Sequence, residues 1–129
     1  MARNRGAEAA PTLKIREMPQ EERPREKLAA HGASALTDPE LIAILLRTGM
    51  TGKNAVEVGR DLLKEYGSLR GLSRCTVDEL RKIRGVGFTK AVQLAAAFDL
   101  GRRIARETLA RQKIETGDSV ALSAETAVR

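Results

Sequence analysis

A short glycine-rich segment between two helical patterns constrains this sequence more than any other feature. The segment covers residues 83–91 and contains Gly85 and Gly87. Glycine has no Cβ and adopts positive φ angles readily, so these two residues allow a tight turn and a close approach of backbone. Apolar residues recur at helical spacing on both sides. The sequence therefore predicts two helices joined by a sharp corner.

A capping box predicts where the helix before this corner begins. The Thr76 hydroxyl is placed to accept from the Glu79 N–H, while the Glu79 carboxylate accepts from the backbone of Thr76. The helix after the corner is predicted from about residue 88 to about residue 110, with Ala91, Leu94 and Phe98 on one face. Its free N–H groups and positive dipole end favour an anion.

A related segment lies 36 residues earlier, where Gly49 precedes Ala55 by six positions, as Gly85 precedes Ala91. A capping box at Thr37 precedes it, and a longer helix is predicted after it. This spacing indicates an internal duplication. Two such corners related by a pseudo-two-fold could each hold one strand of a duplex. The first copy lacks Gly-x-Gly, so its contact with DNA stays open.

Composition favours an all-helical fold. The 129 residues include three aromatic residues and no tryptophan, so the core must consist of aliphatic side chains. One cysteine excludes an intramolecular disulfide and fits a reducing cytoplasm. No apolar stretch approaches the length of a membrane span, so no membrane partner is expected.

Positive charge is concentrated on the second corner and the helix after it. The net charge of the chain is +6, and residues 81–113 hold nine basic and two acidic residues. The remainder holds 14 basic and 15 acidic residues. This distribution predicts binding to a polyanion.

The string LRKIRGVGFTKAVQLAAAFDLGRR resembles a helix-hairpin-helix motif. Three further strings, ERPREKL (22–28), LTDPELIAILLRTG (36–49) and YGSLRGL (66–72), are similar to the N-terminal region of the RadC family, of the UPF0758 type. The resemblance covers roughly residues 15–111. It implies a compact all-α bundle of about five to six helices, built from two helix-hairpin-helix-like units.

The predicted organisation has three parts: a flexible N-terminal tail (1–20), the helical domain (21–111), and a linker with the start of a second domain (112–129). A turn and the beginning of a strand are expected at residues 114–122, and another helix opening at 123–129. In the RadC family the chain here enters a metalloprotease-like domain of the JAMM/MPN type. The metal site of that domain needs two histidines and an aspartate, and this chain has one histidine. The chain end at Arg129 is therefore interpreted as a truncation.

The leading hypothesis is a DNA-binding module without sequence specificity that grips the phosphate backbone of duplex or branched DNA at residues 85–90. Its predicted contacts are Arg84, Gly85, Val86, Gly87, Thr89, Lys90, Arg102, Arg106 and Lys53. The alternative is a scaffold that positions the downstream domain, its own C-terminal partner. No nucleophile–base pair or metal constellation can be assembled, so a catalytic role is not predicted. DNA repair, the role usually given to the RadC family, does not follow from these residues.

A structural explanation accounts for part of the basic charge. Asp99, Arg103, Glu107 and Arg111 follow one another at four-residue spacing with alternating sign, which predicts mutual neutralisation on a solvated helix face. Arg102 and Arg106 are like-charged and are the better candidates for phosphate. No cofactor is predicted from the residues, and the resemblance allows only a monovalent cation held by carbonyls of the corner.

Overall fold

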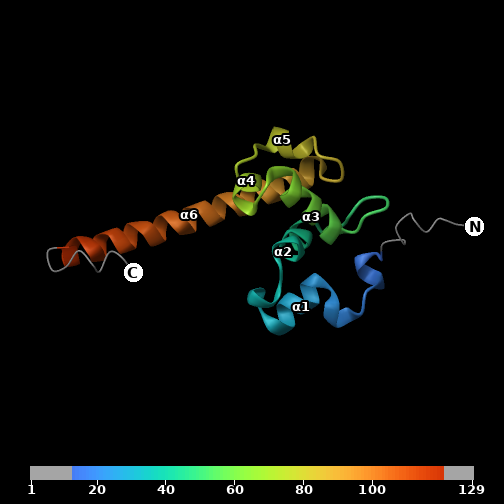
Figure 1. Ribbon diagram of the computed structural model, residues 1–129, viewed down its shortest axis with the longest axis horizontal. Coiled ribbons are helices and arrows are strands. Elements are labelled where there is room, and N and C mark those ends of the chain that lie inside the picture. Colours follow the sequence, from blue (N-terminus) through green and yellow to red (C-terminus); the bar gives the residue numbers. More distant parts are fainter. Residues whose placement is uncertain (1–12, 121–129) are drawn as a thin grey trace, which may run out of the picture. The chain divides into compact units, whose positions relative to one another are not determined.

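The computed structural model describes residues 13–120, with side chains placed for residues 13–115. Six α-helices and three short 3₁₀ turns make up this part of the chain. The turns are η1 (Ile15–Glu17), η2 (Gln20–Glu22) and η3 (Ala33–Ala35); the helices are α1 (Pro24–His31), α2 (Asp38–Leu46), α3 (Ala55–Tyr66), α4 (Leu69–Ser73), α5 (Val77–Arg81) and α6 (Gly87–Val120) (Figure 1). No β-strand occurs among these residues, which confirms the predicted all-α fold.

The chain divides into two units, residues 1–95 and residues 96–129, so that α6 begins in the first unit and continues in the second. The first unit has a core to which each of α2 to α6 contributes one fully buried leucine. These residues are Leu46, Leu62, Leu72, Leu80 and Leu94. Truncating such a side chain to alanine typically costs about 2–5 kcal/mol. The five helices α2 to α6 therefore share one core, and losing any of these leucines should destabilise it.

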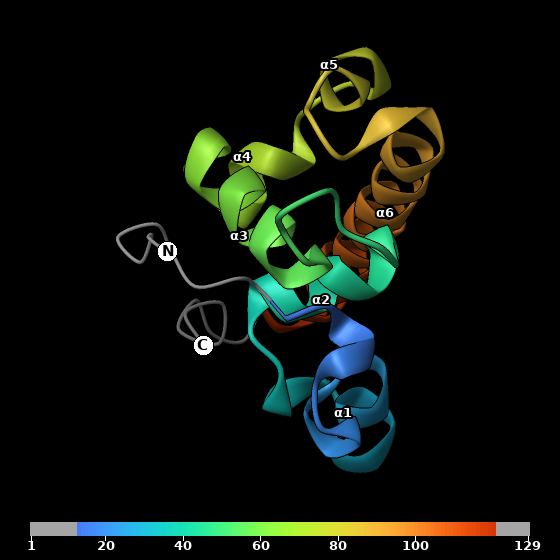
Figure 2. The ribbon, with the colours of Figure 1, turned by 90° about the vertical axis from the view of Figure 1, so that its right-hand side faces the viewer.

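The pairing of α2 with α3 is the most extensive helix contact of the first unit. Gly59 makes this close crossing feasible, because a Cβ there would lie 2.9 Å from the Pro39 carbonyl oxygen. In Figure 2, α1 and the turns before it lie next to α2, away from α4 and α5. Ile42, Ala43 and Leu46 of α2 are buried, so this helix is central to the core.

Both predicted capping boxes are present. The Thr37 side chain accepts from the Glu40 N–H before α2, and the Thr76 side chain accepts from the Glu79 N–H before α5. A third capping box, which the sequence analysis missed, joins Asn54 and Glu57 at the start of α3. These caps satisfy N–H groups that would otherwise lack partners.

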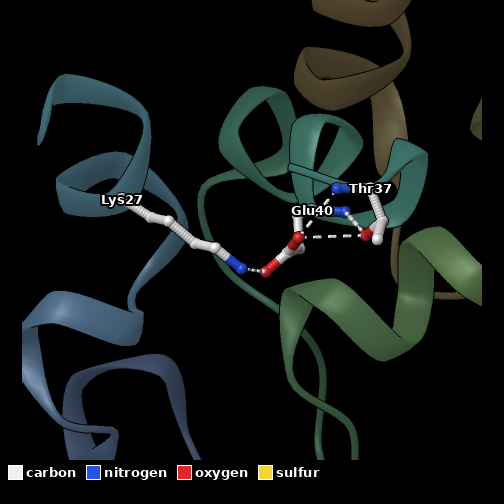
Figure 3. A network of polar contacts seen from close by, with 3 residues as sticks. All are labelled: Lys27, Thr37 and Glu40. Atoms are coloured by element: carbon white, nitrogen blue, oxygen red, sulfur yellow. Dashed lines mark hydrogen bonds and ion pairs between the residues drawn. The ribbon is translucent and has the colours of Figure 1, made fainter. Parts of the chain in front are cut away.

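Glu40 also joins α1 to α2. Its second carboxylate oxygen accepts from the Lys27 ammonium of α1 at 3.0 Å, while its first accepts from the Thr37 N–H at 2.8 Å (Figure 3). Burial alone would raise the pKa of Glu40, but the hydrogen bonds from Thr37 and Lys27 outweigh it and lower the pKa below the ordinary value of 4.5. The ionised form of Glu40 is therefore stabilised by folding.

The Glu40→Gln variant is expected to be less stable than the wild type by about 1 kcal/mol at pH 7. Because the folded-state pKa is depressed, this advantage of the wild type is present above pH 4.5 and is lost as the pH falls through the folded-state pKa. Urea denaturation at a series of pH values measures the difference. Glu21→Gln, at an exposed position, is the control. A stability gap that persists unchanged at pH 3 would contradict the assignment.

Both ends of the described chain differ from the sequence-based expectation. Residues 13–20, part of the predicted flexible tail, contain η1 and the start of η2, and the Asn54 side-chain amide donates to the Leu13 carbonyl at 2.7 Å. Helix α6 continues to Val120, so the turn and strand predicted from residue 114 are wrong over residues 114–120. No proline interrupts this segment, and Gly117 costs only about 1 kcal/mol in a helix interior. Residues 1–12 and 121–129, with the helix opening predicted at 123–129, lie outside the described residues.

Among the helices of residues 13–120, none combines the length and the apolar character that a bilayer crossing requires.

Candidate nucleic-acid interface

The second corner, residues 82–87, joins α5 to α6, whose first residue is Gly87. Its turn is closed by the Val86 N–H, which donates to the Ile83 carbonyl at 3.0 Å. Gly85 has φ 90° and Gly87 has φ 68°, so the predicted positive φ angles at both glycines are confirmed. The Val86 side chain is only 4% exposed and anchors the corner in the core. Of the predicted contact residues, Val86 is therefore not available to a partner, because the residue is buried and its N–H already donates to Ile83.

The two glycines of the corner have different surroundings. A Cβ on Gly85 would lie 2.9 Å from the Met50 sulfur, so Gly85 packs against the loop between α2 and α3. A Cβ on Gly87 would have no atom within 4 Å. Gly85 is thus favoured mainly by its positive φ, because the flexible Met50 side chain could shift, whereas a Cβ on Gly87, the first residue of α6, would meet open space.

The first turn of α6 faces this open space. The first N–H groups of an α-helix have no partner within the helix, and the helix dipole makes this end positive. Gly87, Phe88 and Thr89 are exposed. The backbone donors of this turn are therefore accessible to an anion, as the glycine pattern predicts.

Three residues beside the corner were missed by the sequence analysis. Arg81 and Lys82 are exposed at the end of α5, and the Phe88 ring is 61% exposed. The Arg81 guanidinium lies over the Phe88 ring, 5.8 Å from its centroid, and near the Asp78 carboxylate at 3.9 Å. The sequence does contain a signal for Phe88. It is one of only three aromatic residues in the chain, and it directly follows Gly87.

Lys90 lies at the junction of the two corners. Its ammonium donates to the Thr48 carbonyl at 2.6 Å, and to the Gly49 and Gly85 carbonyls at 3.4 Å each. Partial burial lowers the pKa of this ammonium. The sequence predicts that Lys90 contacts phosphate, and the structure adds a second role for this side chain. Lys90 fastens the loop before α3 to the loop before α6.

The resemblance allows a monovalent cation held by carbonyls of the second corner. One of these carbonyls, that of Gly85, accepts from the Lys90 ammonium at 3.4 Å, so a free ion bound there would compete with this side chain.

The first corner, residues 47–54, joins α2 to α3 through a turn closed by two hydrogen bonds between Met50 and Lys53. The Lys53 ammonium, a predicted DNA contact, forms an ion pair with Asp61 of α3. A cavity of about 560 Å³ lies between the two corners, α3 and α5. Three acidic and three basic side chains line it, so it is not suited to an anion.

Arg84, Arg102 and Arg106 have different electrostatic settings. Arg84 is exposed in the second corner, and no described residue forms an ion pair with it. In the second unit Asp99 pairs with both Arg102 at 3.6 Å and Arg103 at 2.9 Å. Arg102, predicted as a phosphate contact because it and Arg106 are like-charged, therefore also has an acidic neighbour, since a three-residue spacing brings it to Asp99. Arg106 is exposed.

The ladder predicted along this helix is formed only in part. The Asp99–Arg103 pair is present, but among the described residues no ion pair joins Glu107 to Arg103 or Arg111. The described residues also contain no group of three or more metal-ligating side chains that could hold a metal ion.

Taken together, the first unit is a helical domain with two adjacent corners, one of which opens a long helix. Residues 15–92 match the family model of the UPF0758 N-terminal domain. This match covers more than half of the chain, and the chain belongs to the UPF0758 family, in agreement with its resemblance to the N-terminal region of RadC proteins.

Curated relatives support this membership. The chain is 52% identical to a UPF0758 protein of Bordetella pertussis over 89 residues (69% of this chain, 40% of the relative). It is 47% identical to one of Herminiimonas arsenicoxydans over 97 residues (75% and 43%), and 45% identical to one of Shouchella clausii over 111 residues (85% and 48%). The chain thus spans less than half the length of these relatives. Their names state no activity. No solved structure was found to match this chain.

Proposed function

We propose that this chain is a DNA-binding module without sequence specificity, which contacts the phosphate backbone through residues 85–90. The observation that carries the proposal is the open space at Gly87, the first residue of α6, where a Cβ would have no atom within 4 Å. A phosphate placed there would meet backbone N–H donors and the positive end of the helix dipole.

The charges beside the corner support the same proposal. Arg84 and Lys82 are exposed, and Arg81 lies 3.9 Å from the largely solvated Asp78 carboxylate. These cations would neutralise phosphates on either side of the one held at Gly87. Phe88, exposed beside them, would contact sugars rather than read bases. The expected dissociation constant is on the order of 10⁻⁴–10⁻⁶ M at physiological salt.

A test compares two asparagine substitutions at exposed glycines with positive φ. Gly87→Asn fills the open space, and asparagine tolerates this backbone conformation better than most residues. We expect binding of a short duplex to weaken about tenfold, which equals about 1.4 kcal/mol. Gly67→Asn is the matched control, because Gly67 has φ 84°, no atom within 4 Å of a Cβ, and a position at the end of α3. Equal affinities of the two variants would overturn the proposal.

The salt dependence provides an independent measurement. For each phosphate neutralised, the slope of log K against log salt changes by about −0.9. Arg84→Gln is expected to make this slope less steep by about 0.9, and to weaken binding equally for all DNA sequences. Amide shifts during the titration should centre on residues 84–90. Binding that does not depend on salt would rule out contact with the phosphate backbone.

The scaffold alternative is favoured by one observation in the second unit. Leu100, Ile104, Leu109 and Ile114 of α6 are each 61–68% exposed. Exposed apolar side chains along one helix are typical of a surface that docks on another protein segment. If the chain binds no duplex at low salt, positioning of a further domain becomes the better interpretation.

A further inference from the structure

A second cavity, of about 700 Å³, lies on the other side of the first corner, against the turns before α1. Its walls come from the beginning of the described chain, the beginning of α1 and residues of the first corner. The Asn54 side-chain amide donates to the Leu13 carbonyl at 2.7 Å and holds the N-terminal segment beside the start of α3. This contact makes the cavity part of the folded domain.

The lining of this cavity is strongly basic. Six of its residues are cationic and one, Glu26, is acidic; the cations are Lys14, Arg16, Arg23, Arg25, Arg47 and Lys53. Arg23 donates to the carbonyls of Met18 and Arg16, and Lys53 pairs with Asp61. The other four cations form no ion pair with any described residue. This excess of positive charge distinguishes the cavity from the balanced one beside the second corner and suits an anionic ligand.

Arg47 has a backbone conformation that arginine disfavours. Its φ is 70° and its ψ is −48°, and the Thr48 N–H donates across it to the Leu46 carbonyl at 2.7 Å. This arrangement is a γ-turn of the rare, strained kind. Among the described residues Arg47 is the one non-glycine residue with positive φ. A glycine would adopt this conformation with less strain, so the arginine here lowers the stability of the fold.

We propose that this cavity binds a single phosphate-bearing nucleotide, as an unpaired DNA strand presents it. Its volume falls in the usual range for small-ligand pockets. The cations would hold the phosphate, and the apolar side chains of Ile15 and Met50, which also line it, would contact the sugar and base. As a DNA site, the cavity rests on the proposed function. It adds to that function a preference for DNA with an unpaired end. The Lys90 ammonium, bonded to the Thr48 and Gly49 carbonyls, would keep this site beside the second corner.

The Arg47→Gly variant separates binding from folding, because it removes a lining cation and relieves backbone strain. It should be at least as stable as the wild type by urea denaturation. Arg74→Gly is the matched control, since Arg74 is exposed at the end of α4 and lines neither cavity. The ligands are thymidine 5′-monophosphate, inorganic phosphate, a blunt duplex and the same duplex with an unpaired overhang.

We expect the mononucleotide to shift amide signals of residues 47–55 saturably, and the overhang duplex to bind about tenfold more tightly than the blunt one. Both effects should be lost in Arg47→Gly and kept in Arg74→Gly. The proposal is overturned if the mononucleotide shifts nothing there, if inorganic phosphate binds equally well, or if the overhang gives no gain. Failure of the blunt duplex to bind would count against the proposed function alone, because the mononucleotide result still decides the cavity.

Discussion

Gly49→Ala is expected to destabilise the domain by roughly 3 kcal/mol or more. A Cβ at this position would lie 2.1 Å from the Lys53 carbonyl oxygen and 2.6 Å from the Asn54 carbonyl carbon. Both atoms belong to the backbone, so no side-chain movement can relieve the overlap, and the first corner must open. Opening it would break the paired hydrogen bonds between Met50 and Lys53. The measurement is chemical denaturation followed by circular dichroism.

Gly101→Ala is the matched control for this prediction. Gly101 is exposed in α6, and a Cβ there would have nothing within 4 Å. Alanine is favoured over glycine in an exposed helix by about 1 kcal/mol, so this variant should be as stable as the wild type or more so. If Gly49→Ala were equally well tolerated, the corner would have a different backbone path from the one described.

Lys90→Met is expected to destabilise the domain by about 1.5–3 kcal/mol, because it removes hydrogen bonds from a charged donor to three backbone carbonyls. Methionine preserves most of the aliphatic stem, so the loss reports on the ammonium. The amides of residues 48–50 and 84–86 should become more accessible to hydrogen exchange together, since the two corners would separate. Denaturation and hydrogen exchange measure the two effects.

The control is Lys64→Met, which makes the same change at an exposed position of α3 and should alter stability by no more than about 0.5 kcal/mol. A Lys90→Met variant as stable as this control would show that the carbonyl contacts are dispensable. If Lys90→Met stays folded but its slope of log K against log salt for DNA binding becomes less steep by about 0.9, Lys90 also contacts a phosphate directly.

The helices before each corner could be predicted from local sequence, because capping boxes and apolar spacing act over a few residues. Thr37, Thr76 and the glycines of the second corner all have the roles predicted for them. The end of α6 could not be predicted, since its polar composition resembles both a linker and a solvated helix. No stop signal such as proline decides between them there.

The backbone conformation of the candidate interface could be predicted from the sequence, whereas most contacts of its side chains could not. Positive φ at Gly85 and Gly87 follows from residue type, whereas two of the three carbonyls that Lys90 contacts, those of Thr48 and Gly49, lie 42 and 41 residues away in sequence. Contacts at such separation depend on how the helices pack, which a local pattern does not encode. The same reason explains why the cavity beside Arg47 was not foreseen.

The ammonium of Lys90 has a consequence for the thermodynamics of any association made by both corners. Because one side chain bonds to carbonyls of both loops, the two loops are immobilised relative to each other already in the free domain. Their conformational entropy is lost during folding and is not lost again when a ligand arrives. A long polyanion would therefore meet two attachment points at a fixed separation, and would adjust its own path to them.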